Sequence, residues 1–296
     1  MGAYRWVGIL FALGGTVAFA FRPVLIKLGY EAAPVSATTL LFLRMALAFP
    51  FFAAVAWWLR REPPLARRDC AGIVALGFLG YYLASLLDFL GLQYVPAGLG
   101  RLIMFLYPTL VVILSALFLA RRPTGRELSA LAVTYVGIAL VLSQRLGAGP
   151  EHRLFLLGAA LVFGSAMCYA VYLVTGSQLV KRVGSMRFTA YTMMVSTAPA
   201  LVQFALLETP AALQLPGEVW LYAILLATAC TVLPVFLVAE ALKRIGANHF
   251  ALIGGLGPVT TVLADFGLLD GTLTPVQLAG GALVIAGVLL VTLRKG

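Results

Sequence analysis

The chain repeats itself at a fixed spacing of 150 residues. Residues 97–143 align without a gap on residues 247–293, and about a quarter of the aligned pairs are identical. That is roughly two to three times what the bias toward Leu, Ala, Val and Gly would give by chance. The same spacing matches Gly8 with Gly158 and Gly14 with Gly164 near the N-terminus. We therefore predict two copies of one structural unit.

The composition places both copies in a membrane. Hydrophobic residues make up 62% of the chain and charged residues 11%, with a mean hydropathy of +1.01, so a water-soluble fold would lack the polar surface to cover its core. Ten apolar stretches are each long enough to cross a bilayer core of about 30 Å. They cover residues 5–29, 36–59, 70–93, 98–120, 127–144, 155–179, 187–207, 218–242, 247–269 and 275–293. We expect an all-α polytopic membrane protein with ten transmembrane helices.

Five helices per copy is an odd number, so the second copy must run through the membrane in the opposite sense. This arrangement is an inverted-topology repeat. In it, 15 of the 21 basic residues fall on one side, which the positive-inside rule identifies as the cytoplasm, together with both termini. We predict an N-terminal repeat at 1–146, a linker at 147–154 and a C-terminal repeat at 155–296.

Several classes of function are excluded or disfavoured. The net charge of +10 follows membrane topology and does not gather on one soluble face, so we expect no nucleic-acid partner. Three scattered cysteines and two histidines offer no metal-ligand spacing. The chain has neither a P-loop nor an HExxH motif, so we expect no catalytic residues, no cofactor, no metal and no enzyme activity.

Helix-breaking residues recur at matched depth in the two copies. Gly254, Gly257 and Pro258 lie in the ninth apolar stretch, and Pro108 occupies the matching place in the fourth. Such breaks usually face protein or a water-filled path, which makes them candidates for a gate. A second matched set comprises Gly14 and Gly15 with Gly164. Close helix packing is the alternative role for all of these glycines.

Charged residues inside apolar stretches are costly and need partners. The candidates for one charge network are Arg22, Arg44, Asp88, Arg101 and Asp265, with Asp88 available to more than one of the arginines. A structural ion-pair network is one interpretation. The other is that an arginine, Arg44 above all, binds an anionic group of a substrate.

Polar and aromatic side chains at mid-depth are few and could hold a substrate. Aromatic rings can stack on an apolar or aromatic ligand while their hydroxyl groups fix its orientation. The candidates are Tyr81, Tyr82, Ser85, Tyr107, Tyr169, Tyr172 and Thr231. Packing is the alternative role for each of them.

The arrangement resembles the drug/metabolite transporter superfamily, and within it the EamA-like branch. The resemblance is carried by an Ala-x10-Pro pattern in the fourth helix of each copy (Ala97 to Pro108 and Ala247 to Pro258) and by the Leu-Thr-Pro-x-Gln-x-x-Gly stretch at 273–280. The compact length and the tyrosines of the third helix are similar to YddG-type aromatic amino-acid exporters. One departure concerns a Glu that the family usually places before each closing helix. Here those positions hold Arg121 and Gly271, with Asp270 beside the second.

The resemblance and the paired breaks together predict a secondary transporter of the inner membrane. We expect it to export small metabolites, above all amino acids with aromatic or apolar side chains, by alternating access through a central cavity. The expected partners are the small-molecule substrate and the lipid bilayer, and we expect a monomer. The alternative is efflux of drugs, lipophilic cations or other metabolites by the same fold.

Overall fold

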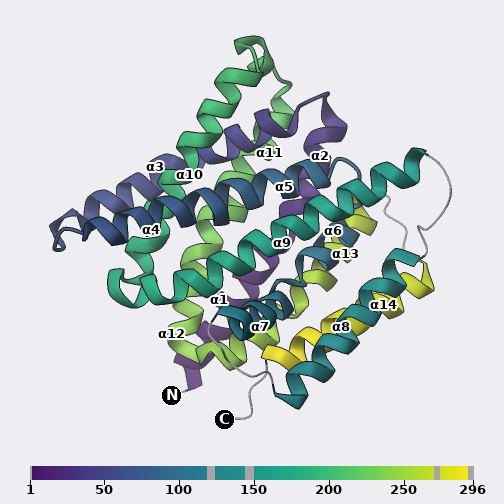
Figure 1. Cartoon of the computed structure of the whole chain (residues 1–296). Helices are drawn as coiled ribbons and strands as arrows, with labels where there is room; N and C mark the ends of the chain where they lie inside the picture. The colour runs from purple at the N-terminus through teal and green to yellow at the C-terminus, as the bar shows by residue number, and fades with distance from the viewer. Residues whose placement is uncertain (1, 119–123, 144–149, 270–273, 293–296) are drawn as a thin grey trace.

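The computed structural model describes residues 2–118, 124–143, 150–269 and 274–292, and every regular element in these ranges is a helix. Long helices cross in several directions around the middle of the molecule (Figure 1). The elements are α1 (Gly2–Ala20), α2 (Arg22–Ala32), α3 (Ala37–Trp58), η1 (Leu59–Arg61), α4 (Arg67–Gly77), η2 (Phe78–Leu83), α5 (Ala84–Gly91), α6 (Ala97–Met104), α7 (Tyr107–Phe118), α8 (Gly125–Ser143), α9 (Pro150–Val183), α10 (Ser185–Leu207), η3 (Pro210–Leu213), α11 (Gly217–Ala227), η4 (Thr228–Val232), α12 (Leu233–Gly254), α13 (Leu256–Leu268) and α14 (Pro275–Thr292). Arg121, Asp270 and Gly271 lie outside the described residues.

The distribution of polarity is the reverse of that in a water-soluble protein. Large apolar side chains are exposed, among them Phe118 at 67% and Leu206 at 78%, whereas Arg44 and Asp88 are 3% and 4% exposed. An apolar surface of this extent matches lipid, and the buried charged groups have to be satisfied by protein. The molecule is therefore built for a bilayer.

Seven helical segments in the described chain are long and apolar enough to cross a membrane. They are Tyr4–Ala32, Ala37–Arg61, Arg67–Gly91, Ala97–Phe118, Glu151–Val183, Ser185–Leu207 and Gly217–Ile245, with shorter apolar helices at Leu256–Leu268 and Pro275–Leu290. The prediction of an all-helical, multi-pass membrane protein is confirmed at this level. The count of ten spans and the cytoplasmic termini stay predictions.

One expected boundary is wrong. The sequence predicts a loop between the stretches that end at 242 and begin at 247, but α12 continues through this region to Gly254. Glu240 bonds Lys243 and Arg244, three and four residues further on, at 2.7 and 3.4 Å. These spacings place opposite charges on one helix face, so the charged cluster is compatible with a helix.

The helices break at matched places in the two halves. α6 ends at Met104 and α7 begins at Tyr107, while α12 ends at Gly254 and α13 begins at Leu256. Pro108 and Pro258 lie in the first turns of α7 and α13, where the missing backbone N–H costs no bond within the new helix, and neither can donate to the helix that ends before it.

The last helix of each half starts with the same cap. The Thr124 and Glu127 side chains and backbone N–H groups bond reciprocally at 2.8–3.3 Å at the start of α8. The Thr274 and Gln277 groups do the same at 3.0–3.2 Å at the start of α14. Each pair forms a capping box, which satisfies backbone N–H groups that a helix start leaves free.

These two capped helices lie side by side (Figure 1, teal α8 and yellow α14). A Cβ on Gly280 would lie 2.6 Å from the Gly137 carbonyl oxygen, and a Cβ on Gly137 would lie 2.6 Å from that of Gly280. Only glycine permits so close an approach. α8 and α14 therefore join the two halves through their backbones.

A π-helical turn interrupts the third helix of each half. η2 covers Phe78–Leu83 between α4 and α5, and η4 covers Thr228–Val232 between α11 and α12. The two turns lie 150 residues apart and are a further feature of the repeat. π-helical turns are often found at functional sites, and both of these border the cavity described next.

Candidate functional site

A cavity of about 340 Å³ lies between the two halves of the chain. Its walls come from helices of both halves, and many lining positions are related by the 150-residue spacing. The related pairs are Phe19 with Tyr169, Gly80 with Cys230, Tyr81 with Thr231, Ser85 with Val235, and Met104 with Gly254. The cavity therefore lies where the two copies face each other.

The charged side chains that line the cavity are unevenly divided between the two copies. Ser85 of the first copy is matched by Val235 of the second, and all three lining arginines, Arg22, Arg44 and Arg101, belong to the first. Duplication of an identical unit would have placed such groups on both sides. The arginines of the cavity thus come from the first copy alone.

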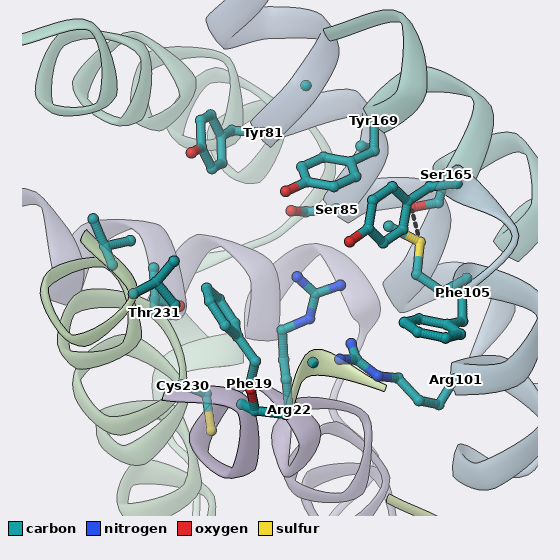
Figure 2. Close-up of a pocket in the computed structure, with 18 of the residues that line it drawn as sticks. Phe19, Arg22, Tyr81, Ser85, Arg101, Phe105, Ser165, Tyr169, Cys230 and Thr231 are labelled. Atoms are coloured by element: carbon teal, nitrogen blue, oxygen red, sulfur yellow. Dashed lines mark hydrogen bonds between the residues drawn. The ribbon is translucent and has the colours of Figure 1, made fainter. Parts of the chain in front are cut away.

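Tyrosines form one wall. The Tyr107 and Tyr169 rings meet edge to face with centroids 5.1 Å apart, and Tyr169 stacks on Tyr172 at 5.8 Å. Tyr172 stands behind the wall, with its hydroxyl 3.3 Å from that of Tyr81 and its ring edge to face with the Tyr81 ring at 5.2 Å. Figure 2 shows the Tyr81 and Tyr169 rings with their hydroxyl groups toward the open space. The wall can contact an apolar group and still offer hydrogen bonds.

Arg44 enters from α3 and is held by its neighbours. Its Nη2 donates to Ser85 Oγ at 2.7 Å, and its guanidinium carbon lies 5.4 Å from the centre of the Phe89 ring. Its Nε is buried and has no hydrogen-bond partner among the described residues. A fixed guanidinium with a free donor is suited to bind a carboxylate.

Arg22 is neutralised by Asp88, which bonds the Arg22 guanidinium from behind the cavity wall. The sequence left the partner of Asp88 open between several arginines, and the structure pairs it with Arg22. Asp265 makes a different contact: its Oδ2 accepts a bond from the Gly98 N–H at 2.9 Å. This bond ties α13 of the second copy to the start of α6 in the first.

Several expected site residues lie away from the cavity. Tyr82 is 8% exposed and donates to Gln203 Oε1 at 2.9 Å, so we leave it out of the proposed binding site. A Cβ on Gly15 would lie 3.1 Å from Val238, and Cβ atoms on Gly14 and Gly164 would lie 3.4 Å from leucines. Of the three, Gly15 has the closest neighbour, and none of them lines the cavity; a role of these glycines in a gate stays a prediction. Of the break residues, Pro108 and Gly254 line the cavity, whereas Gly257 and Pro258 do not.

Sequence reasoning missed Thr16 and Ser165, both of which line the cavity. Each follows a glycine of the matched set directly, and that adjacency was the available signal. The part of the chain that the structure describes contains no group of three His, Cys, Asp or Glu side chains that could hold a metal ion.

An apolar surface, helices that can span a bilayer, and a cavity between two repeated halves with a few polar groups in a mostly apolar lining define a multi-pass membrane protein. The model of the EamA-like transporter family matches the chain twice, over residues 6–143 and 156–293. The chain belongs to the EamA-like transporter family, within the drug/metabolite transporter superfamily.

Two relatives and one solved structure extend this finding. The uncharacterized transporter YcbK of Bacillus subtilis is 30% identical over 286 residues, which cover 92% of this chain and 88% of the relative. The threonine/homoserine exporter RhtA of Escherichia coli is 30% identical over 229 residues, 75% of this chain and 70% of the relative. A crystal structure at 19% identity shares the fold with a TM-score of 0.63 over 96% of both chains.

Proposed function

We propose that this chain is a secondary transporter that exports amino acids across the inner membrane by alternating access. The observation that carries the proposal is the cavity itself, which Arg44 and Ser85 line together with Tyr81, Tyr107 and Tyr169. That combination suits a small solute with a carboxylate at one end and an uncharged side chain at the other.

In the proposed complex Arg44 is the main ligand of the solute carboxylate. Its side chain lines the cavity, and the bond from its Nη2 to Ser85 fixes the guanidinium there for a carboxylate. The solute side chain then contacts Tyr107 and Tyr169, and Thr231 borders the cavity from the second copy. A buried polar group is costly unless it is hydrogen-bonded, so a solute that bonds the polar groups of the cavity is stabilised there.

The proposed topology is ten transmembrane helices in two inverted repeats, with the repeats at 1–146 and 155–296, a linker at 147–154, both termini in the cytoplasm and a monomeric assembly. Its support is the double match of the family model and the recurrence of helix breaks, caps and π-helical turns at a spacing of 150 residues. Rocking of one repeat against the other about the breaks at Pro108 and Pro258 would open the cavity to each side in turn.

Two kinds of side chain fit this site. Aromatic and apolar amino acids fit the tyrosine wall, and the likeness to YddG-type exporters stays a prediction. Small hydroxylated amino acids are the second candidate, because RhtA is named a threonine/homoserine exporter and the wall presents hydroxyl groups. Efflux of lipophilic cations is less favoured, because three arginines line the cavity and would repel a cation.

The test is efflux from liposomes that contain the purified protein. Vesicles are loaded with radiolabelled phenylalanine or threonine and followed with and without a pH gradient, beside empty vesicles. We expect efflux above empty vesicles for at least one of the two. Loss of one charge-assisted bond in Arg44→Gln should cost about tenfold or more in efflux efficiency, with Arg44→Lys less affected. No efflux of any amino acid would refute the proposal.

A further inference from the structure

The charges around the cavity do not balance. Arg22, Arg44 and Arg101 line it, and no aspartate or glutamate is among the described residues that do. Asp88 stands behind the wall and is bonded to Arg22. Two guanidinium groups therefore face the cavity without a bonded carboxylate. An arginine keeps its charge in proteins, so the empty cavity carries an excess of positive charge.

A second set of unbonded polar atoms lies apart from Arg44. The Nε of Arg101, on α6, and the Oγ1 of Thr16, on α1, are both buried without a hydrogen-bond partner among the described residues, and Thr16 is 5% exposed. A Cβ on Gly257 would lie 3.1 Å from Arg101 Nη2 and 3.6 Å from Thr16 Cγ2. The bare Cα of Gly257 therefore borders both side chains.

Unsatisfied buried donors are rare in proteins and are costly, because each has lost its bonds to water. Here the Arg101 guanidinium and the Thr16 side chain both lie beside Gly257, and both residues line the cavity. Figure 2 shows Arg101 and Arg22 reaching the same region. Arg101 and Thr16 line the cavity and have donors without an acceptor among the described residues, so an acceptor on a bound molecule could bond them.

The α-ammonium group of an amino acid has no comparable binding partner in the cavity. An ammonium is bound best by a carboxylate, and the described lining residues include none, while three of them are arginines. Repulsion between a cation and an unpaired guanidinium is strong where water is scarce. The cavity is therefore a poor host for a free α-ammonium.

We infer that the transported solute carries a net negative charge: its carboxylate binds Arg44, and a second acceptor group binds Arg101 and Thr16. The inference rests on the proposed function and replaces its zwitterionic solute with an anionic one. The second acceptor is a carbonyl or a carboxylate, as in an N-acylated amino acid or a dicarboxylic acid without an amino group. Arg101, Thr16 and Gly257 are then determinants of specificity, and Gly257 acts by leaving room for the Arg101 guanidinium.

The test compares compounds that share one skeleton and differ in charge. Calorimetric titration of the purified protein with N-acetyl-L-phenylalanine, L-phenylalanine and L-phenylalaninamide samples net charges from negative through zero to positive. Glutamate and succinate are added to separate a second carboxylate from an acyl carbonyl. We expect N-acetylphenylalanine or succinate to bind about tenfold or more tightly than phenylalanine, glutamate to bind more weakly than succinate, and the amide to bind most weakly.

Variants of Arg101, Thr16 and Gly257 test whether the preference for the anionic probe comes from the group that binds the second acceptor. Arg101→Gln should reduce the preference for the anionic probe to less than about threefold, whereas Arg101→Lys keeps most of it. Thr16→Val should weaken the same probe, and its matched control is Thr175→Val, an exposed threonine on α9 that bonds its own helix at 2.7 Å. Gly257→Val should also weaken it, in contrast to Gly267→Val on the same helix, where a Cβ meets open space.

The outcomes separate this inference from the proposed function. If phenylalanine binds as tightly as every anionic probe, and Arg101→Gln changes neither, the inference is wrong while amino-acid transport stands. Binding of succinate alone, lost in Arg101→Gln, would support the anionic solute and refute the amino-acid assignment. If no probe binds, both are refuted. Should Arg101→Gln fail to fold, the charge series on the unaltered protein still decides the matter.

Discussion

Tyr81 and Thr231 occupy the same position in the two copies, and each belongs to a π-helical turn that borders the cavity. A π turn widens the helix by one residue and leaves carbonyl groups poorly matched to the ordinary bonding pattern. In the second π-helical turn, the Thr231 side chain bonds one such carbonyl group: its Oγ1 donates to the Leu226 carbonyl, five residues back, at 2.7 Å.

Thr231→Val should therefore destabilise the protein by about 1 kcal/mol, since it removes one bond from a buried carbonyl. Thermal unfolding in detergent measures the effect. Thr228→Val is the matched control, because Thr228 in the same turn bonds Ile224 in the ordinary four-residue pattern on an exposed face. Equal effects of the two variants would show that the π turn does not depend on Thr231.

The Arg22–Asp88 pair should behave as one unit. Asp88→Asn leaves a guanidinium without its carboxylate, and Arg22→Gln leaves a buried carboxylate alone, so each single variant should cost about 3–5 kcal/mol. The double variant should cost much less than the sum of the two. A double-mutant cycle on unfolding temperatures measures this coupling, and additive effects would contradict the pairing.

The glycines between α8 and α14 should tolerate no side chain. Gly280→Val would force the helix backbones apart, since even a Cβ lies 2.6 Å from the Gly137 carbonyl oxygen. We expect loss of folded protein in size-exclusion chromatography after expression. Gly217→Val, at a position where a Cβ meets open space, is the control and should express normally. Normal folding of Gly280→Val would show that this contact is not required.

Loss of a capping box should lower the stability of the protein by a smaller amount. Thr124→Ala should lower stability by about 0.5–2 kcal/mol, because it removes the acceptor for the Glu127 N–H. Thr274→Ala should do the same at the matched position. Ser129→Ala, which removes an exposed bond within α8, should change the unfolding temperature little, and an equal loss there would argue against the caps.

Much of the fold follows from the sequence because its causes are local. Hydropathy locates the apolar helices, the 150-residue spacing relates Pro108 to Pro258, and Thr124 and Thr274 mark the starts of the final helices. The π-helical turns escaped prediction, since no residue type is specific to them. The end of α12 was misplaced because hydropathy treats charged residues as a loop, whereas Glu240 and Lys243 bond each other on one helix face.

The site was predictable only in part, for a geometric reason. Tyr81 and Tyr82 are adjacent, so their side chains point about 100° apart around the helix, and the sequence alone does not say which one faces the cavity. The structure places Tyr81 on the cavity wall and turns Tyr82 toward Gln203. Thr16 and Arg101 likewise meet at Gly257 only through the contact of three helices distant in the sequence.

The central claim is that the cavity between the copies binds the transported solute. A comparison of a tyrosine that lines the cavity, Tyr169, with one that does not, Tyr82, tests it most directly. The measurement is amino-acid efflux from proteoliposomes for Tyr169→Phe and Tyr82→Phe, each of which loses one hydroxyl. Tyr169 lines the cavity, so its variant should raise the KM about two- to tenfold, whereas Tyr82→Phe should transport like the unaltered protein. Impaired transport by Tyr82→Phe together with normal transport by Tyr169→Phe would contradict the account.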